Sequence, residues 1–493
     1  MDPGRCYWSH DPAVVEAWDW SRRNMCHREA SCKNLAIGNC LYRHSEDVVE
    51  SVRRNSRPYL IMIGLGHQSL LDLSSTSLGA GISRVYLKNE QSLSSFNLLP
   101  SGQSGQDIVI PGKNPQIQPH GYSNIILTPA GVPARLRPLK NRKILRPDSS
   151  DASTPAYIPY RHKFEPLARA ISVSSPHYNL LSADIVTTAG SLVRLFCLCG
   201  GASPGWLRGQ RWGGSDRLDL ELVGKTLFIF KWENQDNDLN YRHFSGYGHT
   251  FERETCKYEK PFQESSNHSR VVGYKLGNLQ FVVQSEVDGY HCECHTKIKA
   301  PVMSVNTPAK GRAATLNMFE NLTLDDPGDT TANKSPPALG QQQSGTPTPL
   351  GPVTISHGGR SIPGACLVEV KTAIRESPRE PEAQLYFARR KQLYHAEYTR
   401  QQHAGGDLAC FSPGASVEPM SAKLDMWERK NEQVLAKLIK LLAVVRRRME
   451  GSAGKRAVSK AAIIWKTLDG GMTAQLYQRT DGHPVLPSDM YCS

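Results

Sequence analysis

Two short stretches, Leu279-Gln-Phe-Val-Val-Gln-Ser-Glu-Val-Asp288 and Leu367-Val-Glu-Val-Lys371, decide the fold that the sequence predicts. Each is typical of a strand, because apolar residues stand on both sides of its charged residues. Within each stretch the charged residues are two positions apart, so both of their side chains project from one face of the strand. If the two strands are neighbours, three carboxylates and one ammonium meet on one surface.

The chemistry of this meeting point indicates a metal site. Glu286, Asp288 and Glu369 would repel one another unless a divalent cation neutralised them, and hard oxygen ligands suit Mg²⁺ or Mn²⁺. Such a cation polarises a phosphoryl oxygen and generates hydroxide from bound water, while Lys371 orients that water or stabilises developing charge. These residues are the equipment of a metal-dependent phosphodiester hydrolase. The alternative is an ordinary same-face ion pair on a solvated sheet.

Outward from these stretches, the 493-residue chain divides into five segments. We expect a Cys/His-rich module at 1–50, a Ser/Gly-rich spacer at 51–121, a first core part at 122–299, a disordered insertion at 300–362 and a second core part at 363–493. The insertion has few large apolar residues and cannot bury enough surface to offset its ordering entropy. Turns at Gly224-Lys225 and Gly277-Asn278 predict paired strands, and apolar spacing predicts a helix over about 421–449. The predicted class is α/β, a mixed central sheet flanked by helices.

Composition narrows the functional classes. Lys plus Arg (59) exceeds Asp plus Glu (46), which leaves a net charge of +13 and makes a polyanion such as nucleic acid the expected partner. No window approaches the roughly 18–20 apolar residues that a membrane span needs, and the amino terminus lacks the apolar core of a secretory signal. Twelve cysteines in so long a chain are no disulfide framework. We expect an intracellular protein, nuclear or cytoplasmic, that does not bind membranes.

The amino-terminal module carries a second set of candidate ligands. Cys26-x5-Cys32-x7-Cys40-x3-His44 supplies three thiolates and an imidazole, a set that binds tetrahedral Zn²⁺. The string from Cys32 to His44 looks like the ending of a CCCH zinc finger, a module often used on single-stranded RNA, although its intervals depart from the usual order. A set of free thiols is the alternative, and a nearby residue could replace one ligand; these residues are Cys6, His10 and His27.

Three segments in this order resemble a known family: Gly246-Tyr-Gly-His-Thr-Phe-Glu252, Leu276 to Asp288, and Leu367-Val-Glu-Val-Lys-Thr372. They are similar to the decapping exoribonuclease (DXO-type) branch of the PD-(D/E)XK nucleases. Through short motifs over about 124–299 and 364–491, the chain also looks like a group of uncharacterised fungal proteins. The resemblance implies a sheet of PD-(D/E)XK type and assigns roles to six residues. The metal ligands would be Glu252, Glu286, Asp288 and Glu369; Lys371 would be the catalytic lysine; Gln384 would lie near the nucleotide.

One departure from that family bears on turnover. Nucleases of this type usually carry a phosphate-contacting arginine in the helix that follows the Asp184-Ile-Val-Thr element, where this chain has Ala189. Arg194 is the nearest cation and becomes the candidate substrate contact. The sequence therefore predicts a metal-dependent hydrolase of RNA phosphodiesters or RNA 5′ ends, of decapping or exonuclease type. The alternatives are a catalytically inactive RNA-binding protein on a nuclease fold and an interaction scaffold.

Overall fold

The computed structural model describes a subset of the chain, and all structural statements below concern these residues: 62, 65–73, 84–98, 125–129, 132–146, 148, 162–201, 215–232, 246–259, 262–263, 265, 267–291, 353–355, 362–374, 381–403, 406–451, 457–468 and 471–491. The four predicted Zn²⁺ ligands, Cys26, Cys32, Cys40 and His44, lie outside them, so the zinc module stays a prediction. Among the described helices, none is both long and apolar enough to cross a membrane.

An 11-stranded mixed sheet forms the larger part of the fold. Its strands follow the order β1 (Leu65–Asp72), β19 (Gly471–Arg479), β18 (Lys460–Leu468), β7 (Ser215–Val223), β8 (Thr226–Lys231), β6 (Ile185–Thr188), β11 (Leu279–Glu286), β10 (Asn267–Leu276), β2 (Leu87–Leu98), β3 (Ile125–Pro129) and β13 (Val353–Ile355). Strand β6 runs parallel to both of its neighbours, β8 and β11, and β13 runs parallel to β3. The sheet is mixed, as predicted.

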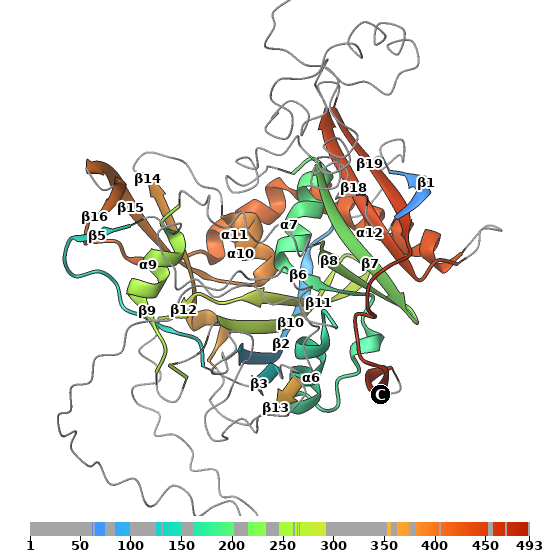
Figure 1. The fold of residues 1–493 in the computed structure, drawn as a ribbon, viewed down its shortest axis with the longest axis horizontal. Helices are drawn as coiled ribbons and strands as arrows, with labels where there is room; N and C mark the ends of the chain where they lie inside the picture. Colours follow the sequence, from blue (N-terminus) through green and yellow to red (C-terminus); the bar gives the residue numbers. More distant parts are fainter. Residues whose placement is uncertain are drawn as a thin grey trace, which may run out of the picture. The chain divides into compact units, whose positions relative to one another are not determined.

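Helices cover both faces of this sheet. Figure 1 shows α7 (Ala189–Leu198), α10 (Glu382–Ala388) and α11 (Ser421–Lys430) on one side of β10 and β11, and α6 (Glu165–Ser174) on the other. Strand alternation explains this, because successive side chains point to opposite faces. In β11, Phe281 belongs to the core cluster that includes α7, α10, α11 and α12 (Glu432–Glu450), and Val282 belongs to the cluster that includes α6. Both faces are therefore apolar.

A second, 8-stranded sheet supports the other half of the site. Its order is β5 (Lys143–Leu145), β16 (Gly406–Phe411), β15 (Gln392–His403), β14 (Leu367–Ile374), β12 (Gly289–Tyr290), β4 (Arg135–Leu136) and β9 (Cys256–Lys257), with β17 (Val417–Pro419) paired to β15. Helix α9 (Gly248–Thr255) packs on this sheet through Phe251, whose ring centroid lies 4.5 Å from that of Phe411. Three short 3₁₀ helices complete the described elements: Leu180–Ser182, Gly364–Cys366 and Ser488–Met490.

Several predicted elements are confirmed. The two turns at Gly224-Lys225 and Gly277-Asn278 join β7 to β8 and β10 to β11. Gly277 has φ +60°, a left-handed conformation that glycine adopts at little cost. The helix predicted over 421–449 is divided into α11 and α12 at Asn431, whose side-chain amide donates to the Trp427 carbonyl at 2.8 Å.

The structure differs from the prediction of a spacer at 51–121. Strand β2 lies inside the larger sheet, paired with β10 and β3, and β1 forms its edge. Serine and asparagine in β2 are buried because tertiary partners satisfy them: Ser94 bonds Ser174 at 3.0 Å, and Asn97 donates to the Val132 carbonyl at 3.0 Å. Residues 353–355, inside the predicted insertion, likewise form β13. Composition could not reveal these distant partners.

Replacing Asp219 is expected to destabilise the larger sheet strongly. Asp219 is buried and accepts from Arg217 Nε at 2.6 Å and from Arg479 Nη1 at 2.7 Å. Asp219→Asn would remove the carboxylate that two buried guanidiniums share, although Arg479 would keep Glu221 at 3.5 Å, so the free energy of unfolding should fall by about 3–5 kcal/mol. Asp481→Asn is the matched control, because Asp481 is 45% exposed and 3.9 Å from the same Arg479. Denaturant unfolding that gives equal losses for both variants would contradict this prediction.

His268 is expected to make the fold acid-sensitive. It is buried, and burial, Arg390 and Arg270 lower its pKa to about 3, so the neutral ring donates from Nδ1 to Asn97 Oδ1 at 2.8 Å. Below the ordinary pKa of about 6.5 only the unfolded chain gains the proton, so stability falls as pH falls. Between pH 7 and pH 5 this residue should remove about 2 kcal/mol of unfolding free energy. His268→Asn, which keeps a donor near Nδ1, should lose correspondingly less in denaturant titrations at the two pH values; an unchanged pH dependence would contradict this assignment.

Candidate active site

The candidate site lies where the chain passes from the larger sheet to the smaller one. Glu286 ends β11 opposite Ser269 of β10, and the Val287 amide donates to the His268 carbonyl at 2.8 Å. Asp288 follows, and the next two residues form β12, which pairs antiparallel with β14. Figure 1 shows α9, β12 and β14 close together at this end of the smaller sheet. The acidic pair, Glu286 and Asp288, therefore lies on the short connection between the two sheets.

The predicted adjacency of the two charged stretches is confirmed. Asp288 Oδ2 accepts a hydrogen bond from the backbone amide of Val370 at 2.7 Å, and Val370 lies between Glu369 and Lys371. On its other side β12 packs closely on β4 and β9, where a Cβ atom at Gly289 would lie 3.0 Å from the Ala134 carbonyl oxygen and 3.1 Å from Cys256 Sγ. A larger residue at position 289 would push β12 away from its neighbours.

Glu369 is the most strongly engaged carboxylate of the site. It is 1% exposed, and its Oε1 accepts from Lys371 Nζ at 2.5 Å and from Gln384 Nε2 at 2.6 Å. Its Oε2 accepts from Arg390 Nη1. The Glu369–Lys371 ion pair that the sequence left as an alternative is therefore present, but in the interior and not on a solvated face. Gln384, from α10, therefore contacts Glu369, and its place near a nucleotide stays a prediction.

Helix α9 contributes Glu252 to the site. The amino-terminal turn of this helix is held by Asp148, whose Oδ1 accepts from the Thr250 amide and hydroxyl, both at 2.9 Å. One turn along, Glu252 is 30% exposed and its Oε2 lies 3.7 Å from His249 Nδ1. Its interaction with the Glu252 carboxylate is the main cause that raises the pKa of His249 to about 9. His249 is therefore a cation at neutral pH, beside the carboxylates.

The pKa values show how charge is distributed over the carboxylates. Burial and then the negative charges of Glu369 and Glu252 raise the pKa of Asp288 well above its ordinary value, and burial and Glu252 raise that of Glu286. Burial opposes ionisation of Glu369 too, but Lys371 and Arg390 outweigh it and hold the pKa of Glu369 below its usual range. Cations therefore compensate the charge of Glu369, whereas ionisation of Asp288 and Glu286 is opposed by their surroundings.

This donor set fits a hard divalent cation in kind. Glu252, Glu286 and Asp288 offer carboxylate oxygens, and their mutual repulsion is the interaction that a bound cation relieves. Among the described residues, however, no group of three His, Cys, Asp or Glu side chains lies close enough together to hold a metal ion as the side chains stand. Glu369 fits least, because both of its oxygens already accept hydrogen bonds. A cation would therefore be held first by the other three residues.

Arg194 does not take the role that the sequence assigned to it. It is buried in α7, and its Nε lies 3.1 Å from Asp216 Oδ2 in an ion pair whose members are 5% and 13% exposed. An interior arginine of this kind stabilises packing between α7 and β7 and is not presented to a substrate phosphate. Ala189 begins α7 and is buried as well, so α7 presents no arginine at either position.

Sequence reasoning missed three residues of this site: His249, Tyr258 and Arg390. His249 had a detectable signal, since it stands one helical turn before Glu252. Burial first, and then the carboxylates Glu286 and Asp288 among its neighbours, raise the pKa of Tyr258. Nothing local distinguishes Arg390 from the adjacent Arg389 and Lys391; only the fold brings it to Glu369.

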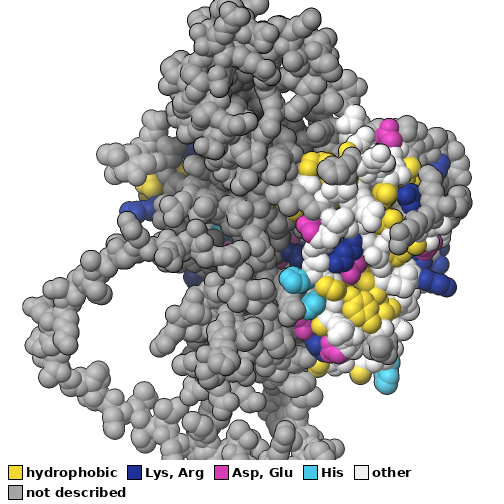
Figure 2. Space-filling view, turned by 45° about the vertical axis from the view of Figure 1, so that its right-hand side comes forward, with side chains coloured by type: hydrophobic (Ala, Val, Ile, Leu, Met, Phe, Trp, Pro, Cys, Tyr) yellow, Lys and Arg dark blue, Asp and Glu magenta, His cyan; other side chains and the backbone are white. Residues whose placement is uncertain are grey.

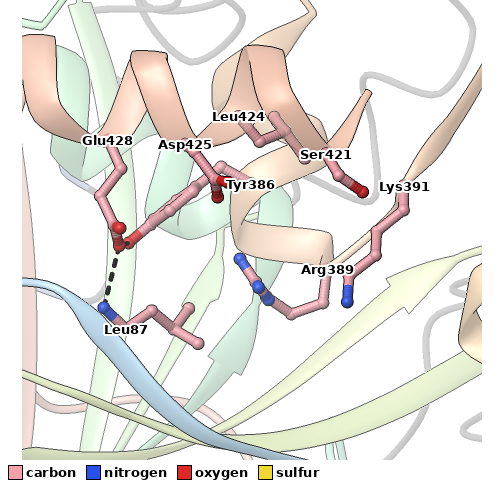
Figure 3. Close-up of a pocket in the computed structure, with 8 residues that line it drawn as sticks. All are labelled: Leu87, Tyr386, Arg389, Lys391, Ser421, Leu424, Asp425 and Glu428. Carbon is pink, nitrogen blue, oxygen red and sulfur yellow. Dashed lines mark hydrogen bonds between the residues drawn. The ribbon is translucent and has the colours of Figure 1, made fainter. Parts of the chain in front are cut away.

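A pocket of about 270 Å³ lies beside the segment that follows α10, and Arg389 and Lys391 are among its lining residues. Figure 3 shows Arg389 and Lys391 on one side of it, Tyr386 behind, and Asp425 and Glu428 of α11 opposite. The acids are partly engaged: Glu428 Oε1 accepts from the Leu87 amide at 2.9 Å. The pocket is therefore lined by both basic and acidic side chains, and one of the basic ones, Arg389, is the chain neighbour of Arg390.

The fold and the site together define a mixed α/β protein with a lysine–carboxylate cluster, centred on the buried Glu369, at the junction of two sheets. The chain belongs to the family described as Domain of unknown function (DUF8563), whose model matches residues 117–493. No curated protein matches the chain.

Solved structures of three fungal proteins are similar to the chain at low identity. Candida albicans Rai1 in complex with pU5-Mn²⁺ has a TM-score of 0.44 and 10% identity, over 85% of this chain and 98% of that one. S. pombe Rai1 has a TM-score of 0.42 and 10% identity, over 82% of this chain and 97% of that one. Scheffersomyces stipitis Rai1 in complex with (3'-NADP)⁺ and calcium ion has 0.42 and 10%, over 84% and 97%.

Proposed function

We propose that this protein is a hydrolase that acts on phosphoester bonds of RNA, at the 5′ end or within the chain, and depends on Mg²⁺ or Mn²⁺. The observation that supports it best is the hydrogen bond from the Val370 amide to Asp288 Oδ2 at 2.7 Å. The two bonded residues are 82 positions apart in the chain, so the bond joins the Glu286/Asp288 stretch to the Glu369/Lys371 stretch and places negative charge beside a lysine. Carboxylates and an ammonium in this arrangement suit attack of water on phosphorus.

The residues divide the work according to their charge. Glu252, Glu286 and Asp288 would hold the divalent cation, which polarises a phosphoryl oxygen and lowers the pKa of bound water. Lys371 Nζ, fixed by Glu369 Oε1 at 2.5 Å, would stabilise the charge that develops on the phosphoryl oxygens as water adds and the P–O bond breaks. Gln384, held on the same Glu369 oxygen, would face the nucleotide.

A second candidate function is RNA binding without turnover. It is favoured by the absence of an arginine at position 189 and by the Arg390–Glu369 ion pair, which neutralises one of the four acids without any metal. On the face in Figure 2, basic side chains of the described residues lie among acidic ones and form no broad basic patch. RNA bound on that face would therefore rely on a few specific contacts and not on a wide electrostatic surface.

The two functions are separated by one experiment on the full chain. RNA bearing a 5′ monophosphate, a 5′ triphosphate or an unmethylated cap is incubated with Mn²⁺ or Mg²⁺, and with EDTA in place of the metal. The hydrolase predicts metal-dependent release of nucleotides or of the terminal group from at least one substrate. Salt-sensitive RNA binding with intact RNA in every reaction would support the second candidate and overturn the first.

A further inference from the structure

Arg390 occupies an unusual position for an arginine. Its side chain is 2% exposed and donates to three acceptors: Glu369 Oε2, the Glu286 carbonyl and Ser285 Oγ, the last at 3.4 Å. One guanidinium therefore connects the end of β11 with the central carboxylate of β14. Charge-assisted hydrogen bonds of a planar guanidinium to a buried carboxylate are among the strongest in proteins.

The fold delivers this guanidinium rigidly. Helix α10 ends at Ala388, and the next residue, Arg389, is in a left-handed conformation with φ 54°. The Arg390 amide donates back to the Leu385 carbonyl at 2.9 Å. Arg270 of β10 donates to the Arg389 carbonyl at 3.2 Å and so fixes the same turn. Gly364 leaves room for this, because a Cβ there would lie 2.6 Å from Arg270 Nη2. The Arg390 side chain is therefore buried and held in the site by the fold around it.

The position has a direct consequence for cation binding. Glu369 Oε2 accepts from Arg390, and Oε1 accepts from Lys371 and Gln384, so a cation that uses Glu369 must displace at least one of these donors. Lys371, Arg390 and His249 supply the positive charges that face the four carboxylates of the site. Without Arg390 the net charge facing a cation would be more negative by one unit.

We propose that Arg390 competes with a divalent cation for Glu369, so that the native chain binds the cation weakly through Glu252, Glu286 and Asp288, and removal of the guanidinium strengthens cation binding. The inference concerns the site of the proposed function, but it is a statement about binding and does not require turnover. Arg390 is in this sense a positioning residue. Its guanidinium, and not a metal ion, holds Glu369 and the end of β11 together.

The test is calorimetric titration of Mn²⁺ into the full native chain and into variants. Arg390→Met, similar in length and uncharged, should lower the Kd for Mn²⁺ at least about tenfold, the scale of one strong charge-assisted bond. Arg390→Lys keeps the charge and should change the Kd by less than about threefold. The matched control is Arg389→Met, because Arg389 pairs with Glu90 at 3.0 Å and not with Glu369; it should leave the Kd unchanged. An Arg390→Met Kd equal to or weaker than that of the native chain would overturn the proposal.

Two further measurements keep the test decisive. Asp288→Asn introduced into Arg390→Met should abolish the gain, which shows that the tighter ion is in this site; a gain that persists would overturn the proposal. If circular dichroism shows Arg390→Met to be unfolded, a crystal structure of the native chain soaked in MnCl₂ replaces it. The expected structure keeps Arg390 on Glu369, with Mn²⁺ on the other carboxylates or absent; Mn²⁺ coordinated by Glu369 overturns the proposal. Hydrolysis is assayed separately, so lack of turnover with an improved Kd rejects only the proposed function.

Discussion

Asp288→Asn should reduce the rate of metal-dependent RNA hydrolysis by about a thousandfold or more, while the protein stays folded. Asparagine keeps the oxygen that accepts from the Val370 amide at 2.7 Å, so the junction between β12 and β14 persists. The substitution removes a negative charge from the carboxylates that would hold the cation, whose stabilisation of the transition state amounts to several kcal/mol. Single-turnover rates at saturating Mn²⁺, and again at tenfold higher Mn²⁺, measure the loss.

The control for Asp288→Asn is Glu397→Gln, which changes an exposed acid on β15 of the same sheet. It should keep the native rate within about twofold, because an exposed charge away from the cluster is screened by solvent. Thermal unfolding of both variants checks that the fold is intact. If folded Asp288→Asn protein hydrolysed RNA at the native rate, the carboxylate cluster would not be the catalytic site.

Lys371→Met should lower the hydrolytic rate constant by about 10²–10³-fold with little change in RNA affinity. In the proposed mechanism the Lys371 ammonium donates to the phosphoryl oxygens. Loss of one donor to a developing oxyanion typically lowers a rate constant by this factor. Glu369 would keep Arg390 and Gln384 as partners, so its negative charge would still be compensated. Rates and RNA dissociation constants measured on the same preparation separate the two effects.

Lys275→Met provides the matched control for the lysine, since Lys275 is exposed on β10 and lies outside the cluster. We expect it to leave the rate constant unchanged. A Lys371→Met variant that loses RNA affinity in proportion to its rate would show that the lysine binds the ground state and the transition state alike. Such a result would contradict the assignment of Lys371 to stabilisation of the transition state.

The sequence was informative wherever a property depends on residues close together in the chain. The two-residue spacing in Glu286-Val-Asp288 and Glu369-Val-Lys371 placed each pair on one strand face, and the Gly277-Asn278 turn predicted the β10–β11 pair. The mixed α/β class followed from such local patterns. The segment 51–121 was misread because Ser94 and Asn97 are polar, and only their distant partners allow them to be buried.

Arginine residues show most clearly what only the tertiary structure decided. Local sequence suggested Arg194 as the substrate contact, but packing of α7 against β7 pairs it with Asp216 in the interior. Arg390 looked like any basic residue after a helix, yet it meets Glu369, 21 positions away, and Ser285, 105 positions away. Periodicity determines which face of its own strand or helix a side chain occupies. Which distant charge it meets depends on the pairing of strands and the docking of helices, and these are settled by burial over the whole core.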